Sequence, residues 1–95
     1  MPAYVLVELS IRNKELYEEY KLLTPETIEA YGGRFVVRGG TTELLEGDWN
    51  PGRIVLLEFP SAERAREWWE SEEYTIARGI RQRAAETRMI ILQGV

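Results

Sequence analysis

The side chains able to carry chemistry in this sequence are limited, because it contains neither histidine nor cysteine. Ser/His and Cys/His nucleophile pairs, structural zinc sites and disulfides are therefore excluded. Catalysis or binding must come from Asp, Glu, Arg, Lys, Tyr, Trp, Ser and Thr. Ten of the twelve basic residues are Arg, whose guanidinium binds carboxylate or phosphate through two parallel hydrogen bonds. The composition therefore leaves local anion recognition open.

Glu8, Arg38 and Glu58 form the first candidate site. Each lies in an expected strand, and alternation puts all three on the strand faces that no helix covers. We expect the first and third strands to be adjacent and parallel, which would bring Glu8 beside Glu58, with Arg38 close by. Adjacent carboxylates raise the pKa of one of them, so the pair can act as a general base while Arg38 holds an anion or carbonyl. The alternative is an ion network at a subunit interface, because buried charges are usually paired for structural reasons.

A second candidate site lies around Ser71, where the second helical segment is interrupted. Trp69 and Tyr74 flank this break, and irregular backbone there can open a cleft for a flat ligand. Arg78 follows Tyr74 by one turn on the same side, so we expect it to hold an anion. Aromatic residues at helical spacing are more often core, and this alternative applies above all to Tyr17, Tyr20 and Trp68.

The elements that position these residues follow in the order β-α-β-β-α-β. The expected strands are 3–11, 34–38, 53–59 and 89–95, and the expected helices begin after Asn13 and Ser61, each interrupted once, at Thr24-Pro25 and at Ser71. Residues 39–52 are predicted to continue the second strand past a bulge at Gly39-Gly40 and to turn at 47–52, since long unstructured loops are uncommon in compact domains. In the last helix, Arg78, Arg81 and Arg83 are expected to point mostly outward.

This order predicts a ferredoxin-like α+β fold, with a four-stranded antiparallel sheet and the helices on one face. Residues 1–95 are expected to be a single domain. No signal-like N-terminus and no long apolar run is present, so we expect a cytoplasmic protein without a membrane segment. A net charge of −4 disfavours nucleic acid as a partner, although Arg78, Arg81, Arg83 and Arg88 form a basic stripe.

The two faces of the predicted sheet differ in composition. One face is wholly apolar and is expected to lie beneath the helices: Val5, Val7, Leu9, Phe35, Val37, Val55, Leu57 and Phe59. The other face is mixed, not polar: Tyr4, Leu6, Glu8, Val36, Arg38, Ile54, Leu56, Glu58, Met89, Ile91 and Gln93. Such a patch is larger than monomers usually leave in water. We therefore predict a twofold homodimer in which the uncovered faces meet, with Trp49 either plugging the hairpin tip or contacting the second subunit.

A resemblance to the family of unknown function DUF1330 covers nearly the whole chain. It is carried by Tyr31 to Gly40, Leu45 to Trp49, Pro51, Val55, Glu58 to Ser61, and Trp69 to Tyr74 with Arg78 and Arg81. That family is similar in fold to the dimeric α+β barrel superfamily, which implies a homodimer. Wider relatives include cofactor-independent monooxygenases of aromatic polyketides, haem-degrading oxygenases, muconolactone isomerases and chlorite dismutases. The haem-binding members commonly use a His, which is absent here, so the resemblance implies no haem.

These observations predict a dimer that binds a small anionic or carbonyl-bearing organic molecule in each subunit, with isomerase or cofactor-free oxygenase chemistry. Arg38 and Arg78 would orient the anion, the two glutamates of the first site would transfer a proton, and Trp69 with Tyr74 would stack on the ligand. No metal or cofactor is expected. The alternative is a non-catalytic structural or interaction dimer whose Glu/Arg cluster only stabilises the fold and the interface.

Overall fold

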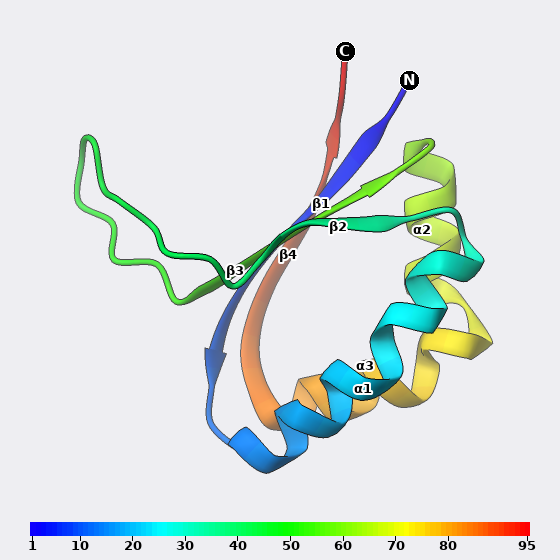
Figure 1. Cartoon of the computed structure of the whole chain (residues 1–95), viewed down its shortest axis with the longest axis horizontal. Helices are drawn as coiled ribbons and strands as arrows, with labels where there is room; N and C mark the ends of the chain where they lie inside the picture. Colours follow the sequence, from blue (N-terminus) through cyan, green and yellow to red (C-terminus); the bar gives the residue numbers. More distant parts are fainter.

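The computed structural model describes the whole chain, residues 1–95. Its elements are β1 (Ala3–Ile11), α1 (Lys14–Ala30), β2 (Arg34–Arg38), β3 (Arg53–Phe59), α2 (Ala62–Glu70), α3 (Glu72–Ala84) and β4 (Ala85–Gln93). The strands form one antiparallel sheet in the order β2-β3-β1-β4. All three helices lie on one side of this sheet (Figure 1). The predicted ferredoxin-like α+β fold is confirmed. None of the helices combines the length and apolar character needed to span a bilayer.

Each helix begins at the cap residue that the sequence predicts. The side chains of Asn13, Ser61 and Ser71 each accept a hydrogen bond of 3.1 Å from the backbone N–H three residues further on. The Ser71 hydroxyl also donates to the carbonyl of Trp68 at 2.7 Å. One serine therefore ends α2 and begins α3, which explains the predicted break between them.

Helix α1 is continuous through Pro25, so the predicted interruption at Thr24-Pro25 is wrong. Proline has no N–H, and the carbonyl of Lys21 consequently loses its helical partner. The guanidinium of Arg38 donates to that carbonyl at 3.3 Å. A donor from β2 thus replaces the missing helical bond, which lets the helix continue and ties it to the sheet.

The core lies between the sheet and the helices. Trp68 is its largest member, with 1% of its surface exposed. Its ring centroid lies 4.1 Å from that of Tyr74 and 5.4 Å from that of Phe59, and its indole N–H donates to Thr27 Oγ1 at 3.0 Å. The assignment of three aromatic residues to the core is confirmed for Tyr17, Tyr20 and Trp68.

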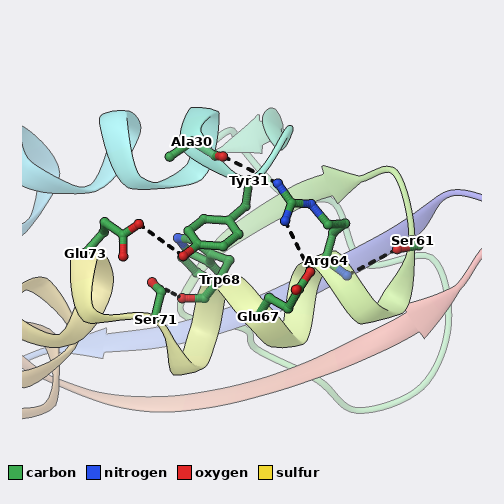
Figure 2. Close-up of polar contacts among 8 residues, drawn as sticks. All are labelled: Ala30, Tyr31, Ser61, Arg64, Glu67, Trp68, Ser71 and Glu73. Carbon is green, nitrogen blue, oxygen red and sulfur yellow. Dashed lines mark hydrogen bonds and ion pairs between the residues drawn. The ribbon is translucent and has the colours of Figure 1, made fainter.

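Polar contacts fix the C-terminal end of α1 to the other two helices (Figure 2). Arg64 of α2 donates to the carbonyl of Ala30 at 3.5 Å and to Glu67 at 3.2 Å, and its guanidinium lies 4.9 Å from the ring centroid of Tyr31. The Tyr31 hydroxyl in turn donates to Glu73 Oε2 of α3 at 3.1 Å. The three helices are therefore joined at this end of the layer.

Strand β4 faces the opposite way from the prediction. Met89 and Ile91 pair with Val7 and Val5 of β1, and therefore lie on the helix-covered face. The open face of the sheet instead carries Arg88, Ile90 and Leu92 of this strand. Four consecutive residues, 89–92, are apolar, so their alternation does not indicate which side the helices cover.

Strand β2 contains a bulge, but not at Gly39-Gly40 as predicted. Phe35 pairs with Leu57 and Arg38 with Val55, so three steps along β2 match two steps along β3, with the irregularity at Val36. The bulge turns Arg38 to the helix-covered face, where its guanidinium lies 4.3 Å from the ring centroid of Phe35. Bulges commonly redirect side chains in this way. The prediction that Arg38 lies on the open face is therefore wrong.

Residues 39–52 form a long connection and do not extend the hairpin. Figure 1 shows this loop projecting past the end of the sheet, away from the helices. Every residue from 40 to 50 is exposed, so no face of the segment is covered as a strand would require. The predicted continuation of the strand is wrong for that reason, although the chain does bend near the predicted turn.

Candidate functional site

The structure separates the two glutamates that were predicted to share a site. Strands β1 and β3 are antiparallel, so Glu8 pairs with Ile54 whereas Glu58 pairs with Tyr4. Ile54 and Glu58 are four residues apart along β3, which corresponds to about 13 Å. The predicted parallel pairing is wrong because the α1 crossover keeps β1 and β2 parallel, and the β2–β3 connection then reverses the chain.

Glu8 lies on the open face of the sheet. It forms an ion pair with Arg88, and its Oε2 accepts hydrogen bonds from Trp49 Nε1 and the Gly52 N–H, both at 3.3 Å. The hydrogen bond from Arg88 is the main reason why the pKa of Glu8 lies below its ordinary value of 4.5. The carboxylate thus holds Trp49, and with it the base of the 39–52 loop, against the sheet.

Acid should release Trp49 from this contact. Because the pKa of Glu8 is lowered in the folded protein, the contact is fully formed above the ordinary value of 4.5 and is lost as the pH falls through the lower folded value. The NMR signal of the Trp49 indole N–H should therefore titrate below pH 4.5. In Glu8→Gln the signal should show no such titration. A midpoint at or above the ordinary value in the parent protein would contradict this account.

Glu58 also has its own arginine on the open face. Arg34 Nη2 lies 2.7 Å from Glu58 Oε1, and the two residues are direct partners across β2 and β3. The Glu8, Arg38 and Glu58 cluster is therefore not assembled. Each glutamate instead pairs with another arginine, and Arg38 lies on the other side of the sheet.

The second predicted site is also divided. Trp69 leaves 39% of its surface exposed, whereas Tyr74 is completely buried. The guanidinium of Arg78 lies 4.5 Å from the ring centroid of Trp69 and donates to the carbonyl of the same residue. Arg78 consequently closes the C-terminal end of α2 and stacks on its tryptophan.

The cation buried in this region is Arg81, one turn beyond Arg78. Only 4% of its surface is exposed, and its Nε donates to the Tyr74 hydroxyl at 3.2 Å, which lies 2.6 Å from the Tyr20 hydroxyl. Burial raises the pKa of Tyr20 well above its ordinary value of 10.0, so this phenol is neutral. No carboxylate oxygen lies within 4.0 Å of the Arg81 guanidinium. Its charge has no counter-ion within the chain.

Sequence reasoning assigned Arg81 to the outer face, yet a signal for burial was present. Positions 74, 77, 81 and 84 follow at spacings of three, four and three, which is the spacing of one helix face. The other three residues on this face are apolar or aromatic, and all four are buried. An arginine on an otherwise apolar, buried helix face therefore indicated a buried charge, and with it a candidate binding site.

Arg81 lies on the wall of an open groove of about 370 Å³ between α2, α3 and β4, which we call the α3/β4 groove. Thr87 lines the same groove, and its Oγ1 is the one buried side-chain polar atom without a hydrogen-bond partner. The remaining walls are largely apolar and include Ala65, Trp68, Trp69, Met89 and Ile91. Small-molecule sites occupy about 300–1,000 Å³. The groove therefore has the size and the polar groups to hold a small organic anion.

No acidic residue lines the α3/β4 groove. Elsewhere in the chain, no three Asp or Glu side chains gather as they would around a metal ion. The chemistry of the groove is therefore set by a guanidinium, a hydroxyl and an aromatic face.

The antiparallel sheet with all helices on one face, and a groove along its β4 edge, define a ferredoxin-like α+β protein. The chain belongs to the family described as "Domain of unknown function (DUF1330)", which it matches over residues 2–95. No curated protein sequence matches it.

Solved structures share this fold. The RPA0582 protein of unknown function from Rhodopseudomonas palustris has a TM-score of 0.78 at 25% identity, covering 99% of this chain and 82% of that one. SnoaB, a cofactor-independent oxygenase from Streptomyces nogalater, has a TM-score of 0.67 at 10% identity, covering 99% and 93%. A dimeric protein of unknown function with a ferredoxin-like fold from Bacteroides fragilis has a TM-score of 0.57 at 15% identity, covering 98% and 96%. The last two likenesses concern the fold alone.

Proposed function

We propose that this protein is a homodimer in which each subunit binds a small organic anion with a flat apolar body in the α3/β4 groove. The observation that carries this function is Arg81, buried without a carboxylate partner beside the unpartnered Oγ1 of Thr87. A buried charge without a counter-ion is costly. A carboxylate or enolate would neutralise the guanidinium and accept a hydrogen bond from the threonine, while Trp69 supplies a flat contact surface.

The proposal includes a reaction class, which is isomerisation or cofactor-free oxygenation of the bound anion. A fixed guanidinium stabilises negative charge that develops on a carbonyl oxygen in either reaction. The fold of the chain is similar to that of SnoaB, which is described as a cofactor-independent oxygenase. Glu8 and Glu58 do not line the α3/β4 groove, so this proposal gives them no proton-transfer role.

The homodimer in this proposal rests on the open face of the sheet. Leu6 pairs with Leu56 on one side and with Ile90 on the other, so an apolar row crosses three strands. Ile90 and Leu92 are substantially exposed in the single subunit. A second copy of the chain would cover this row, and the similar Bacteroides fragilis protein is described as dimeric.

Benzoate binding tests the site, with benzamide as a neutral molecule of the same shape. Benzoate should shift the NMR signals of the Arg81 Nε–H and the Trp69 indole N–H in a saturable manner, and benzamide should not. Arg81→Gln should weaken benzoate binding by at least about tenfold, because a hydrogen bond to a charged group is removed. Arg83→Gln is the matched control, since Arg83 is an exposed residue of the same helix.

A second variant keeps the test decisive if Arg81→Gln fails to fold. Thr87→Val removes a buried hydroxyl that has no partner in the free protein, so it should raise the free energy of unfolding by about 1 kcal/mol. The same variant should weaken benzoate binding about fivefold, because the hydroxyl donates to the ligand. Equal responses to benzoate and benzamide, or unchanged benzoate affinity in both variants, would rule out the α3/β4 groove as the site.

A second candidate function is a non-catalytic structural dimer. It is favoured by the separate ion pairs of Glu8 with Arg88 and of Glu58 with Arg34, which both lie on the face proposed to meet the partner. For this function Glu58→Gln should markedly lower dimer stability, and benzoate should bind nowhere. Benzoate binding that depends on Arg81 would eliminate it.

A further inference from the structure

Besides Arg81, a pair of cations without counter-ions lies at the corner where α1 meets β2 and β3. Arg38 pairs with Val55, and Arg53 lies two residues before Val55, so the two arginines are diagonal neighbours on the helix-covered face. No carboxylate oxygen lies within 4.0 Å of either guanidinium. Lys21 is also close, but it is neutralised by Glu18 at 2.7 Å. Like charges at such positions repel each other. The chain has a net charge of −4, yet none of its acidic residues neutralises these two arginines.

The backbone and the neighbouring side chains hold both guanidiniums in place. Arg53 Nε donates to the Tyr17 hydroxyl at 3.0 Å. This bond does not use the two terminal nitrogens of the Arg53 guanidinium. Gly39 has φ +71°, and a Cβ there would lie 2.1 Å from Arg53 Nη1. A side chain at this position would be strained and would displace the Arg53 guanidinium, so glycine leaves the guanidinium its place. Arg38 rests on the ring of Phe35 and makes a single hydrogen bond of 3.3 Å, to the carbonyl of Lys21.

Beneath these guanidiniums is a mainly apolar chamber, lined on the sheet side by Val7, Leu9, Val55 and Leu57. No acidic residue lines it. Its free interior is about 20 Å³, which is enough for about one water molecule. A ligand at this corner can therefore bury a group no larger than a methyl, while its charged end remains at the opening.

We propose that this corner is a second anion site, which takes a short-chain carboxylate between Arg38 and Arg53. The planar forks of the two guanidiniums match the oxygens of a carboxylate. The methyl group of acetate fits the chamber, whereas an aromatic ring does not. The site is separate from the α3/β4 groove and does not depend on the function proposed for that groove.

Acetate binding tests the corner, with acetamide as the neutral isostere and ionic strength held constant with chloride. Acetate should shift the NMR signals of the Nε–H groups of Arg38 and Arg53 in a saturable manner, and acetamide should leave them unchanged. Arg38→Gln and Arg53→Gln should each weaken acetate binding by at least about tenfold. Arg34→Gln is the matched control, because Arg34 lies on the same strand but its guanidinium pairs with Glu58 on the open face.

Further variants separate this site from the groove. Arg38→Lys keeps the charge but loses the fork, so it should bind acetate with an affinity between those of the parent and Arg38→Gln. Thr87→Val should leave acetate binding unchanged. The proposal is overturned if acetamide produces the same shifts as acetate, or if Arg38→Gln and Arg53→Gln bind acetate as tightly as Arg34→Gln. Benzoate binding at the groove is unaffected by either outcome, so the two proposals fail independently.

Discussion

Replacement of Trp68 by alanine should lower the free energy of unfolding by about 3–5 kcal/mol, which is the usual cost of removing a buried aromatic side chain. Trp68 is almost completely buried, and its ring packs between Phe59 and Tyr74. The substitution also leaves Thr27 Oγ1 without the indole donor that it has at 3.0 Å. Both losses occur inside the core, where strand β3 meets the helix layer.

The adjacent tryptophan provides the control. Trp69→Ala should cost about 1 kcal/mol or less, because Trp69 is half-exposed and its main loss is the contact with Arg78. Urea denaturation of the parent and both variants, followed by circular dichroism, measures the difference. Equal effects of the two substitutions would contradict the placement of Trp68 in the core. A destabilisation of Trp68→Ala below that of Trp69→Ala would do so more strongly.

Leu6→Glu should convert the proposed dimer to a monomer. Leu6 lies at the centre of the apolar row, between Leu56 and Ile90, and an unpaired carboxylate at this point would be buried against the partner. Burial of an unpaired charge costs several kcal/mol, so the dissociation constant should rise by about a thousandfold or more. Analytical ultracentrifugation should show a mass near 11.0 kDa for the variant, against twice that value for the parent.

Leu22→Glu is the matched control for the dimer. Leu22 is a leucine on α1 with 81% of its surface exposed, and it lies on the helix side of the sheet, away from the proposed interface. This variant should remain dimeric. The dimer proposal fails if the parent sediments at 11.0 kDa at micromolar concentration, or if Leu6→Glu and Leu22→Glu have the same mass.

The local features of the fold were predictable because each depends on residues close together in the sequence. A cap such as Asn13 or Ser71 acts on an amide three residues away, and the apolar alternation of β1 and β3 identifies their buried faces. The effect of Pro25 was misjudged because the donor that compensates for its missing N–H is Arg38, which lies in strand β2 and not in the helix. No local pattern contains that information.

The candidate site was less predictable, since it depends on how distant segments meet. The direction of β3 relative to β1 decided that Glu8 and Glu58 are apart. Arg81 lacks a counter-ion because none of the segments packed around it places a carboxylate nearby. The periodicity of its own helix does not reveal this. The spacing of positions 74, 77, 81 and 84 did indicate that Arg81 is buried, and the helix break at Ser71 was correctly predicted.

Because of the bulge at Val36, the face of the sheet on which Arg38 lies depends on strand pairing as well as on residue identity. If the same residues alternated regularly without the bulge, Arg38 would stand three residues after Phe35 and would lie on the opposite face of the sheet, whereas deletion of that one valine would restore regular pairing and keep Arg38 on the helix-covered face. Two homologous chains could therefore both retain this arginine and yet differ in whether it faces the helices. A comparison of such chains should establish whether the strand is bulged between Phe35 and Arg38 before it equates their arginines.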